Sequence, residues 1–252
     1  MKIVADLLVK ERVRLTSAHT LLSLFRPSLP HIQPGQFVEV RVDKSPATFL
    51  RRPISIHNYN GSDTIELLVH DVGEGTYQLC ETPVGNTLNC VLPLGNGFSL
   101  PESPQAVLLV GGGVGVAPLL HLGKTLHERG CHVTFILGGK TSDDILRREA
   151  FEPYGRICLT TEDGSAGTKG FVTQHEAMHA TQYDIIYTCG PKPMMQAVAR
   201  IAREKDIPCQ ASLENMMACG LGACLCCVEK TTSGNRCVCT DGPVFDTKEL
   251  TW

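Results

Sequence analysis

Cysteines crowd one short stretch near the end of this sequence. Six of the twelve cysteines fall between positions 219 and 239. Three of them, Cys219, Cys224 and Cys227, follow the spacing C-x4-C-x2-C, which is typical of plant-type [2Fe–2S] clusters. Gly220 and Gly222 lie within this spacing, and glycine permits the positive φ angles and close backbone approach that a loop wrapped around a cluster requires. The segment therefore predicts a one-electron carrier held in a loop-rich lobe.

Structural zinc is the alternative for this segment, because zinc also favours four thiolates. Zinc sites usually take their ligands from two separate cysteine pairs, whereas three candidates share one loop here, so iron–sulfur is favoured. The fourth ligand stays open on the residues alone, since Cys237 and Cys239 are both available. Cys226 adjoins Cys227 and is expected to point the other way.

Composition limits the class of protein. A chain of 252 residues suggests one to three domains, and 42% hydrophobic with 19% charged residues is typical of folded globular chains. The net charge of -3 gives no reason to expect nucleic acid as a partner. No apolar run of roughly 18 residues occurs, so no membrane span is expected. The charged N-terminal stretch does not resemble a secretory signal, so we expect a cytoplasmic chain whose cysteines serve metal or redox chemistry.

The first part of the chain, residues 1–99, reads as a small antiparallel β barrel. Residues 37–42 and 64–69 alternate between apolar and polar side chains, and another strand is expected at 48–50. Glycine- and proline-containing turns separate these stretches, as in compact barrels.

Residues 100–210 read as an α/β domain with a parallel sheet. The continuous apolar run at 106–110 indicates a strand buried on both faces, and it leads through a glycine run into a helix ending near residue 129. Strands and helices then alternate, which predicts parallel pairing. The further strands are expected at 133–138, 157–160 and 184–189, and the further helices near 143–151, 171–180 and 194–203. The remaining residues, 211–252, form the expected cysteine lobe.

Two motifs in the barrel region can bind an anion. In Arg52-Pro53-Ile54-Ser55, an arginine beside a proline-fixed turn can reach a diphosphate. Gly75-Thr76 can open a helix whose first amides receive phosphate. An exposed arginine on a strand and a helix cap without a ligand are the plainer interpretations of the two motifs taken singly.

The α/β region carries two further motifs. Glycines 111–113 and 115 lie between a buried strand and a helix, where backbone amides can meet a dinucleotide phosphate, although the run does not match G-x-G-x-x-G. Cys189-Gly190-Pro191 ends the last buried strand, at the sheet edge where a ligand is expected. A tight turn and a buried cysteine are the alternatives. Asp143 and Asp144 disfavour a 2′-phosphate despite Lys140, so NAD is expected rather than NADP.

Taken in order, these motifs carry a resemblance to a known family. The barrel motifs, the run Gly111-Gly112-Gly113-Val114-Gly115-Val116-Ala117-Pro118 and Cys189-Gly190-Pro191-Lys192-Pro193-Met194 resemble the ferredoxin–NADP reductase superfamily. With the cysteine segment and Asp241-Gly242-Pro243-Val244-Phe245, the whole chain resembles the electron-transfer subunits of type B dihydroorotate dehydrogenases. The resemblance implies an FAD barrel, an NAD domain and a [2Fe–2S] lobe. It also implies a separate FMN-containing catalytic subunit in pyrimidine (UMP) biosynthesis, in a heterotetramer.

The resemblance also implies roles for particular residues. Arg52, Gly75 and Thr76 would bind the FAD diphosphate, and Ser55 would lie near the flavin ring. Val69, His70 and Asp71 would line the flavin or ribityl region. Pro53 and Ile54 would also belong to the cofactor-binding residues. Gly112, Gly113, Val114 and Gly115 would approach NAD, with Cys189 near the nicotinamide. The cluster ligands would be Cys219, Cys224, Cys227 and Cys239, because the family's last ligand precedes x-Asp-Gly-Pro. Cys226 and Cys237 have no implied role.

On this interpretation, electrons are expected to pass from FMN in the partner through the cluster and FAD to NAD+. Two rival hypotheses remain. One is a reductase subunit of a hydrogenase or of an NADH-dependent ferredoxin:NADP oxidoreductase, which would share the same layout. The other is a redox-sensing or zinc-stabilised binding module without turnover.

Overall fold

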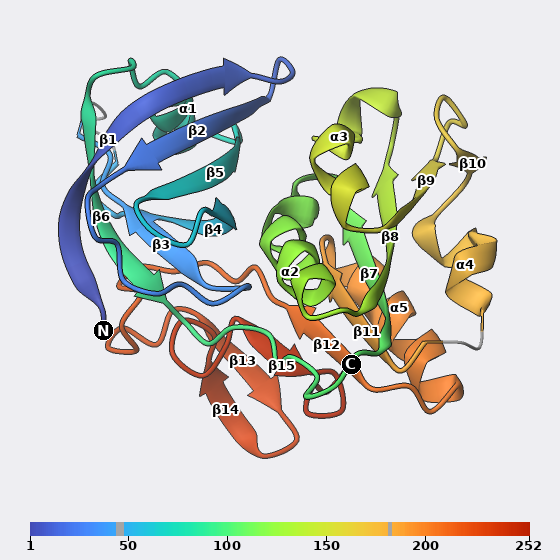
Figure 1. Ribbon diagram of the computed structural model, residues 1–252. Helices are drawn as coiled ribbons and strands as arrows, with labels where there is room; N and C mark the ends of the chain where they lie inside the picture. The colour runs from blue at the N-terminus through green and yellow to red at the C-terminus, as the bar shows by residue number, and fades with distance from the viewer. Residues whose placement is uncertain (44–47, 181–182) are drawn as a thin grey trace. The chain divides into compact units, whose positions relative to one another are not determined.

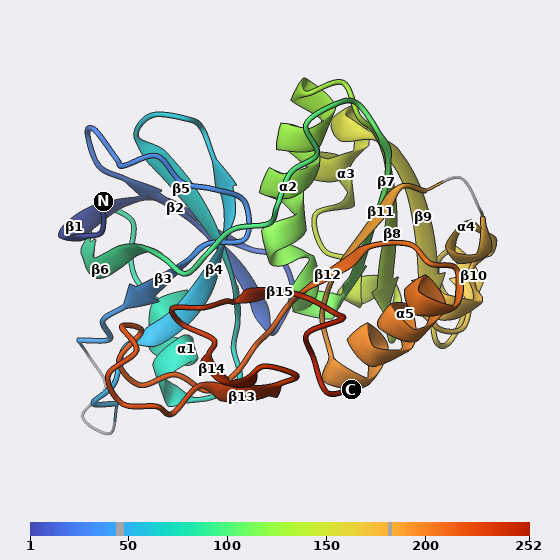
Figure 2. The same ribbon diagram turned by 90° about the horizontal axis from the view of Figure 1, so that it is seen from below.

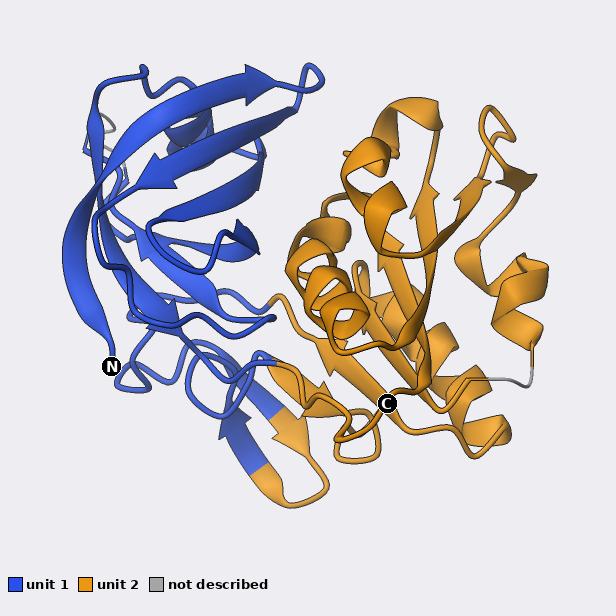
Figure 3. Ribbon diagram, in the orientation of Figure 1, with its two compact units in different colours: residues 1–97, 215–229, 235–243 blue, residues 98–214, 230–234, 244–252 orange. Residues whose placement is uncertain are grey.

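The structure, a computed structural model, describes residues 1–43, 48–180 and 183–252 and contains two compact units (Figures 1 and 3). Unit 1 comprises Met1–Gly97, Asn215–Glu229 and Asn235–Pro243, and unit 2 comprises Phe98–Glu214, Lys230–Gly234 and Val244–Trp252. The C-terminal segment therefore contributes to both units. The division into residues 1–99, 100–210 and 211–252 stays a prediction.

Unit 1 contains a closed barrel of six strands in the order β1-β2-β5-β4-β3-β6, all paired antiparallel, which confirms the predicted barrel. Alternate side chains of these strands fill its interior, among them Val38, Val40 and Val69. The strands are β1 Ile3–Arg14, β2 His19–Phe25, β3 Phe37–Val40, β4 Arg52–Tyr59, β5 Thr64–His70 and β6 Thr87–Leu94, and helix α1 spans Glu74–Cys80.

The strand expected at 48–50 is wrong, because β4 begins only at Arg52. Phe49 and Leu50 suggested a strand by their apolar character, but both side chains are exposed rather than packed in the barrel. The arginine-proline motif therefore opens a strand instead of following one.

Unit 2 is built on a sheet in the order β10-β9-β8-β7-β11-β12-β15. All neighbours are parallel except β12 and β15, as the alternation of strands and helices predicted for this region. Helices α2 and α3 lie on one face of the sheet and α4 and α5 on the other (Figures 1 and 2). The strands are β7 Ala106–Gly112, β8 His132–Gly139, β9 Arg156–Thr161, β10 Thr168–Lys169, β11 Ile185–Cys189, β12 Cys209–Ser212 and β15 Val244–Asp246.

The helices agree only in part with the sequence-based expectation. Helices α2 (Ala117–Glu128) and α5 (Lys192–Glu204) lie where they were expected. The helix expected at 143–151 is broken, because Arg147 adopts a left-handed φ of 58°, and only α3 (Arg148–Phe151) is α-helical. Similarly, α4 (Glu176–His179) covers only part of 171–180.

Strands β13 (Val228–Thr231) and β14 (Gly234–Cys237) form a small two-stranded sheet in the cysteine-rich segment. Within the described ranges, no helix has the length and apolar character needed to cross a membrane.

Candidate cofactor sites

The cysteine segment folds as a loop that turns its backbone toward its own sulfur atoms. Gly220, Gly222 and Leu225 have φ angles of 66°, 82° and 58°, which bend the loop repeatedly. The N–H of Leu221 donates to Cys219 Sγ at 3.4 Å, and the N–H of Cys239 donates to Cys227 Sγ at 3.4 Å. Amide donors directed at sulfur are a means by which proteins hold and tune metal-bound thiolates.

The four predicted ligands come together as two pairs of thiols. Cys224 lies near enough to Cys219 to lower the pKa of its thiol, and Cys227 lies near enough to Cys239 to raise the pKa of that thiol. Cys219 also raises the pKa of Cys239, so the two pairs are close to one another. Two neighbouring pairs of cysteines can each supply two thiolates, as a cluster of two irons requires.

The thiols of this segment differ in their readiness to ionise. Hydrogen bonds from backbone N–H groups, chiefly that of Leu221, lower the pKa of Cys219 to about 6. Burial, followed by the interaction with Cys227, raises the pKa of Cys239 to about 12. Since thiolates are the ligands of iron, cluster assembly at Cys239 must release a proton.

Cys237 lies close to the same thiols but is not enclosed like them. Cys227 and Cys239 are buried, whereas Cys237 is half-buried and Cys226 is exposed. Burial, followed by the nearby Cys227 and Asp241, raises the pKa of the Cys237 thiol. Burial therefore favours Cys239 as the fourth ligand.

In unit 1, the positively charged side chain of Arg52 lies against the start of α1. A Cβ atom added at Gly75 would lie 2.6 Å from Nε of Arg52, so the guanidinium rests directly on the glycine backbone. The Thr76 hydroxyl accepts from the N–H groups of Val72 and Gly73 at 2.9 and 3.1 Å and fixes the loop before α1. A guanidinium at this position suits a diphosphate, to which it can donate two parallel hydrogen bonds.

The other residues assigned to the flavin lie on neighbouring strands. Antiparallel pairing of β4 with β5 places the start of β4, with Pro53, Ile54 and Ser55, beside the end of β5. Val69 is fully buried in the barrel core, so only its backbone is available to a ligand. The His70 ring stacks on His19, with ring centroids 4.4 Å apart. Asp71 follows the strand, and its N–H donates to the carbonyl of Ala18 at 2.8 Å.

In unit 2, the glycine turn after β7 presses against the turn after β11. A Cβ atom at Gly115 would lie 2.4 Å from Cα of Gly190 and 2.6 Å from the carbonyl oxygen of Cys189. A Cβ atom at Gly112 would lie 2.6 Å from Sδ of Met194. Gly113 has a φ of 55° and open space around it, and Val114 follows in the 3₁₀ turn. This backbone surface lies at the carboxyl ends of two adjacent parallel strands, where nucleotides bind in such sheets.

Cys189 and Asp144 are both used by the protein itself. The Cys189 thiol is fully buried, donates toward Glu214 Oε1 at 3.9 Å, and has its pKa raised by burial. Its predicted place near the nicotinamide stays a prediction. Asp144 Oδ2 accepts from the N–H groups of Lys140 and Thr141 at 3.0 and 2.9 Å, so it closes its own loop. Of the two aspartates expected near the ribose, only Asp143 is exposed.

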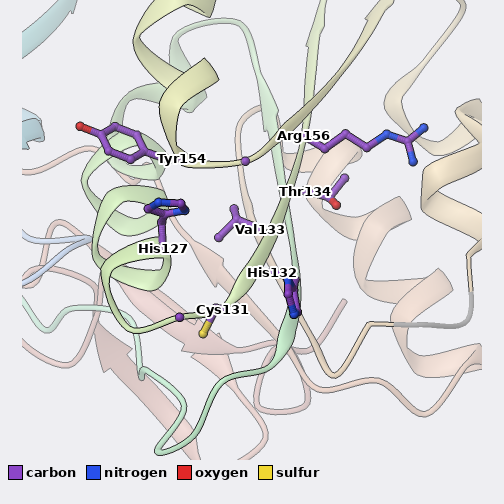
Figure 4. A pocket seen from close by; sticks show the side chains of 9 residues that line it. His127, Cys131, His132, Val133, Thr134, Tyr154 and Arg156 are labelled. Atoms are coloured by element: carbon purple, nitrogen blue, oxygen red, sulfur yellow. The ribbon is translucent and has the colours of Figure 1, made fainter.

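A pocket of about 500 Å³ lies at the opposite edge of the sheet, where β8 and β9 begin (Figure 4). His127 and Tyr154 lie on the side of α2, whereas Thr134 and Arg156 extend to the other side of the strands. These side chains do not converge on one ligand. We assign the pocket no cofactor, because it lies at the amino ends of the strands.

Sequence reasoning missed one polar residue near the cysteine segment. Glu39 lies in β3 between two core valines, and its alternating position indicated an ordinary outward, solvated side chain. It is 1% exposed instead, because the cysteine segment covers it at Gly220. A glutamate in an otherwise apolar strand was the only signal.

Comparisons with known proteins agree with this arrangement. The family model "Iron-sulfur cluster binding domain of dihydroorotate dehydrogenase B" matches residues 214–251, and "Oxidoreductase NAD-binding domain" matches 109–200. The chain is 42% identical over 225 residues to the dihydroorotate dehydrogenase B (NAD(+)) electron transfer subunit of Shouchella clausii, covering 86% of each chain. It is 38% identical over 257 residues to the subunit of the same name from Bacillus caldolyticus, an alignment that covers 99% of this chain and 97% of that relative.

A solved structure of an NADH-dependent reduced ferredoxin-NADP oxidoreductase is also similar. It aligns with a TM-score of 0.88 at 31% identity and covers 98% of this chain and 90% of that chain. The alignment therefore extends over barrel, sheet and cysteine segment alike.

Proposed function

The chain belongs to the family of electron transfer subunits of dihydroorotate dehydrogenase B (NAD(+)), and from this premise we propose how its residues divide the work. It is an oxidoreductase subunit that uses FAD, an iron–sulfur cluster and NAD, and it acts with a catalytic subunit. We infer further that this partner carries FMN, oxidises dihydroorotate, and joins two copies of each subunit in a cytoplasmic heterotetramer.

The observation that carries the proposal is the cysteine loop of unit 1, in which backbone amides are directed at the sulfur atoms of Cys219 and Cys227. Cys219, Cys224, Cys227 and Cys239 would hold the [2Fe–2S] cluster there. The Leu221 N–H stabilises the Cys219 thiolate. When bound, the cluster supplies one-electron transfer, FAD joins one- and two-electron steps, and NAD+ accepts a hydride.

Arg52 and the Gly75–Thr76 loop bind the FAD diphosphate in the same unit, and Ser55 and His70 border the flavin. Gly112, Gly113, Val114 and Gly115 let the NAD phosphates approach the backbone of unit 2. Cys189 stays a neutral thiol, because burial raises its pKa, and it lines the nicotinamide site without acting as a nucleophile.

The cysteine segment also supplies the docking face for the catalytic subunit. Met216, Leu221 and Leu225 are exposed large apolar side chains within a few residues of the predicted ligands. Apolar side chains in such a position are typical of a protein–protein interface. A partner that covers them brings its own redox group toward the cluster.

The test is to purify the chain anaerobically, alone and with its partner. Alone, it should show flavin and iron–sulfur absorbance and reduce dyes with NADH, but it should not oxidise dihydroorotate. Dihydroorotate oxidation by the single chain would contradict the division of labour. A colourless, zinc-loaded protein would instead support the binding-module hypothesis.

A reductase subunit of an NADH-dependent ferredoxin-NADP oxidoreductase is the second candidate, supported by the structural alignment over 98% of the chain. The higher identities to dihydroorotate dehydrogenase subunits favour the first. The protein that co-purifies with the chain distinguishes the two, since the first candidate requires an FMN protein that oxidises dihydroorotate.

A further inference from the structure

Glu39 is a buried acid placed between the barrel and the cysteine segment. Strand β3 directs Val38 and Val40 into the barrel core, so Glu39 faces outward. The cysteine loop lies over it, since a Cβ atom at Gly220 would be 2.7 Å from Cγ of Glu39 and 3.0 Å from its Oε1. The glutamate is therefore enclosed by the cluster-binding segment rather than by the barrel interior.

Its carboxyl group has no hydrogen-bond partner within the described part of the chain, at either oxygen. Burial raises the pKa of Glu39 to about 7, with Cys219 raising it further and Arg51 and Arg52 opposing the shift. Arg51 is held elsewhere, because it donates to the backbone carbonyls of Glu39 and Asn89 and to Asn89 Oδ1. A buried carboxyl group without a partner destabilises a fold, so its presence calls for an explanation.

The electrostatic neighbours of Glu39 belong to both predicted redox sites of unit 1. Cys219 is a predicted cluster ligand, and Arg52 is the predicted ligand of the FAD diphosphate. A negative charge at this point opposes the addition of an electron to the cluster and has little water to screen it.

We propose that Glu39 is a positioning residue that lowers the reduction potential of the cluster and so favours release of its electron toward the flavin. The inference rests on the proposed function, because it requires the cluster at Cys219. One electron enters and leaves the cluster, no bond forms or breaks, and the carboxylate acts only through its field.

The test compares the wild-type chain with E39Q and a matched control, E66Q. Glu66 also lies on a barrel strand, β5, where its Oε2 accepts from Asn58 Nδ2 at 3.1 Å. Each substitution replaces a carboxylate by an amide of the same shape. The anaerobic full-length protein, with FAD and iron content measured first, is reduced stepwise at about pH 9, and the reduced cluster is followed by EPR.

In E39Q, the ratio of reduced to oxidised cluster at a fixed potential should rise about tenfold. For a one-electron couple, this equals a midpoint potential about 59 mV more positive. E66Q should match the wild type. An E39Q midpoint equal to that of the wild type would overturn the inference. Loss of the cluster from both E39Q and E39N would overturn it too, because Glu39 would then be a structural support. A wild-type chain lacking cluster or flavin would refute the proposed function instead.

Discussion

The cysteine segment of unit 1 and the glycine turn of unit 2 offer cofactors opposite kinds of surface. The first presents side chains, four thiols gathered in two pairs. The second presents bare backbone, where the backbone of Gly190 and Cys189 leaves no room for a side chain at Gly115. The cysteine segment should lose its cofactor when one thiol is removed. The glycine turn should lose affinity for its cofactor when a single methyl group is added.

The largest effect is expected for C224S, with C226S as its control. Cys224 and Cys226 are both exposed and two residues apart, but only Cys224 pairs with Cys219. C224S should abolish the iron–sulfur absorbance and electron transfer from the partner subunit. FAD and NADH-dependent dye reduction should survive, because they do not need the cluster.

C226S should keep its full iron content and spectrum. Loss of the cluster in C226S, or its retention in C224S with the wild-type EPR signal, would contradict the assigned ligand set. C237S and C239S provide the same comparison for the fourth ligand.

The glycine turn is tested by G115A against G130A, a change at the end of α2 outside the turn. The new methyl group at 115 would meet the backbone of Gly190, which cannot move aside as a flexible side chain does. We expect the Kd for NADH to rise about a hundredfold, equivalent to about 3 kcal/mol, with flavin and cluster spectra unchanged.

G130A adds the same methyl group in ordinary contact with Pro104, at a φ of 81°. It should lower stability by about 1 kcal/mol through backbone strain while NADH affinity stays within about threefold of the wild type. Equal losses of NADH affinity in the two variants would mean that the close approach to Gly190 is not what matters. NADH binding is measured by calorimetry.

The sequence predicted features that depend on local side-chain patterns better than features that depend on contacts between distant segments. Side-chain patterns such as the cysteine spacing and the apolar run at 106–110 predicted the cysteine loop and β7, because local chemistry determines them. The burial of Glu39 was not predictable, since it depends on Gly220 lying over β3 from far along the chain. Likewise, the break at Arg147 and the capping role of Asp144 depend on loop conformations that periodicity does not encode.

Neighbouring arginines in the barrel sharpen the contrast within unit 1. R52Q removes the guanidinium above Gly75 and should weaken FAD binding about 10- to 100-fold, because bonds to charged groups contribute about 1.5–3 kcal/mol. R51Q removes donors to Glu39 and Asn89 and should lower stability while folded protein keeps its FAD affinity. Flavin release on dilution and urea unfolding measure the two effects. Equal flavin loss in both variants would show that Arg52 has no specific role.

The smallest effect concerns His175, a polar side chain of unit 2 that supports the fold rather than a cofactor. Its Nδ1 accepts the N–H of Ala177 at 3.0 Å and caps α4, and burial lowers the pKa of His175. The unfolded chain therefore binds the proton more readily. The contribution of His175 to stability should be constant above about pH 6.5 and fall as the pH drops below it. H175N keeps a capping side chain without titrating, so in urea unfolding it should remove the acid-side loss that His175 contributes. If H175N also weakened NADH binding, it would be wrong that the backbone of unit 2 binds the nucleotide while polar side chains such as His175 only stabilise the fold.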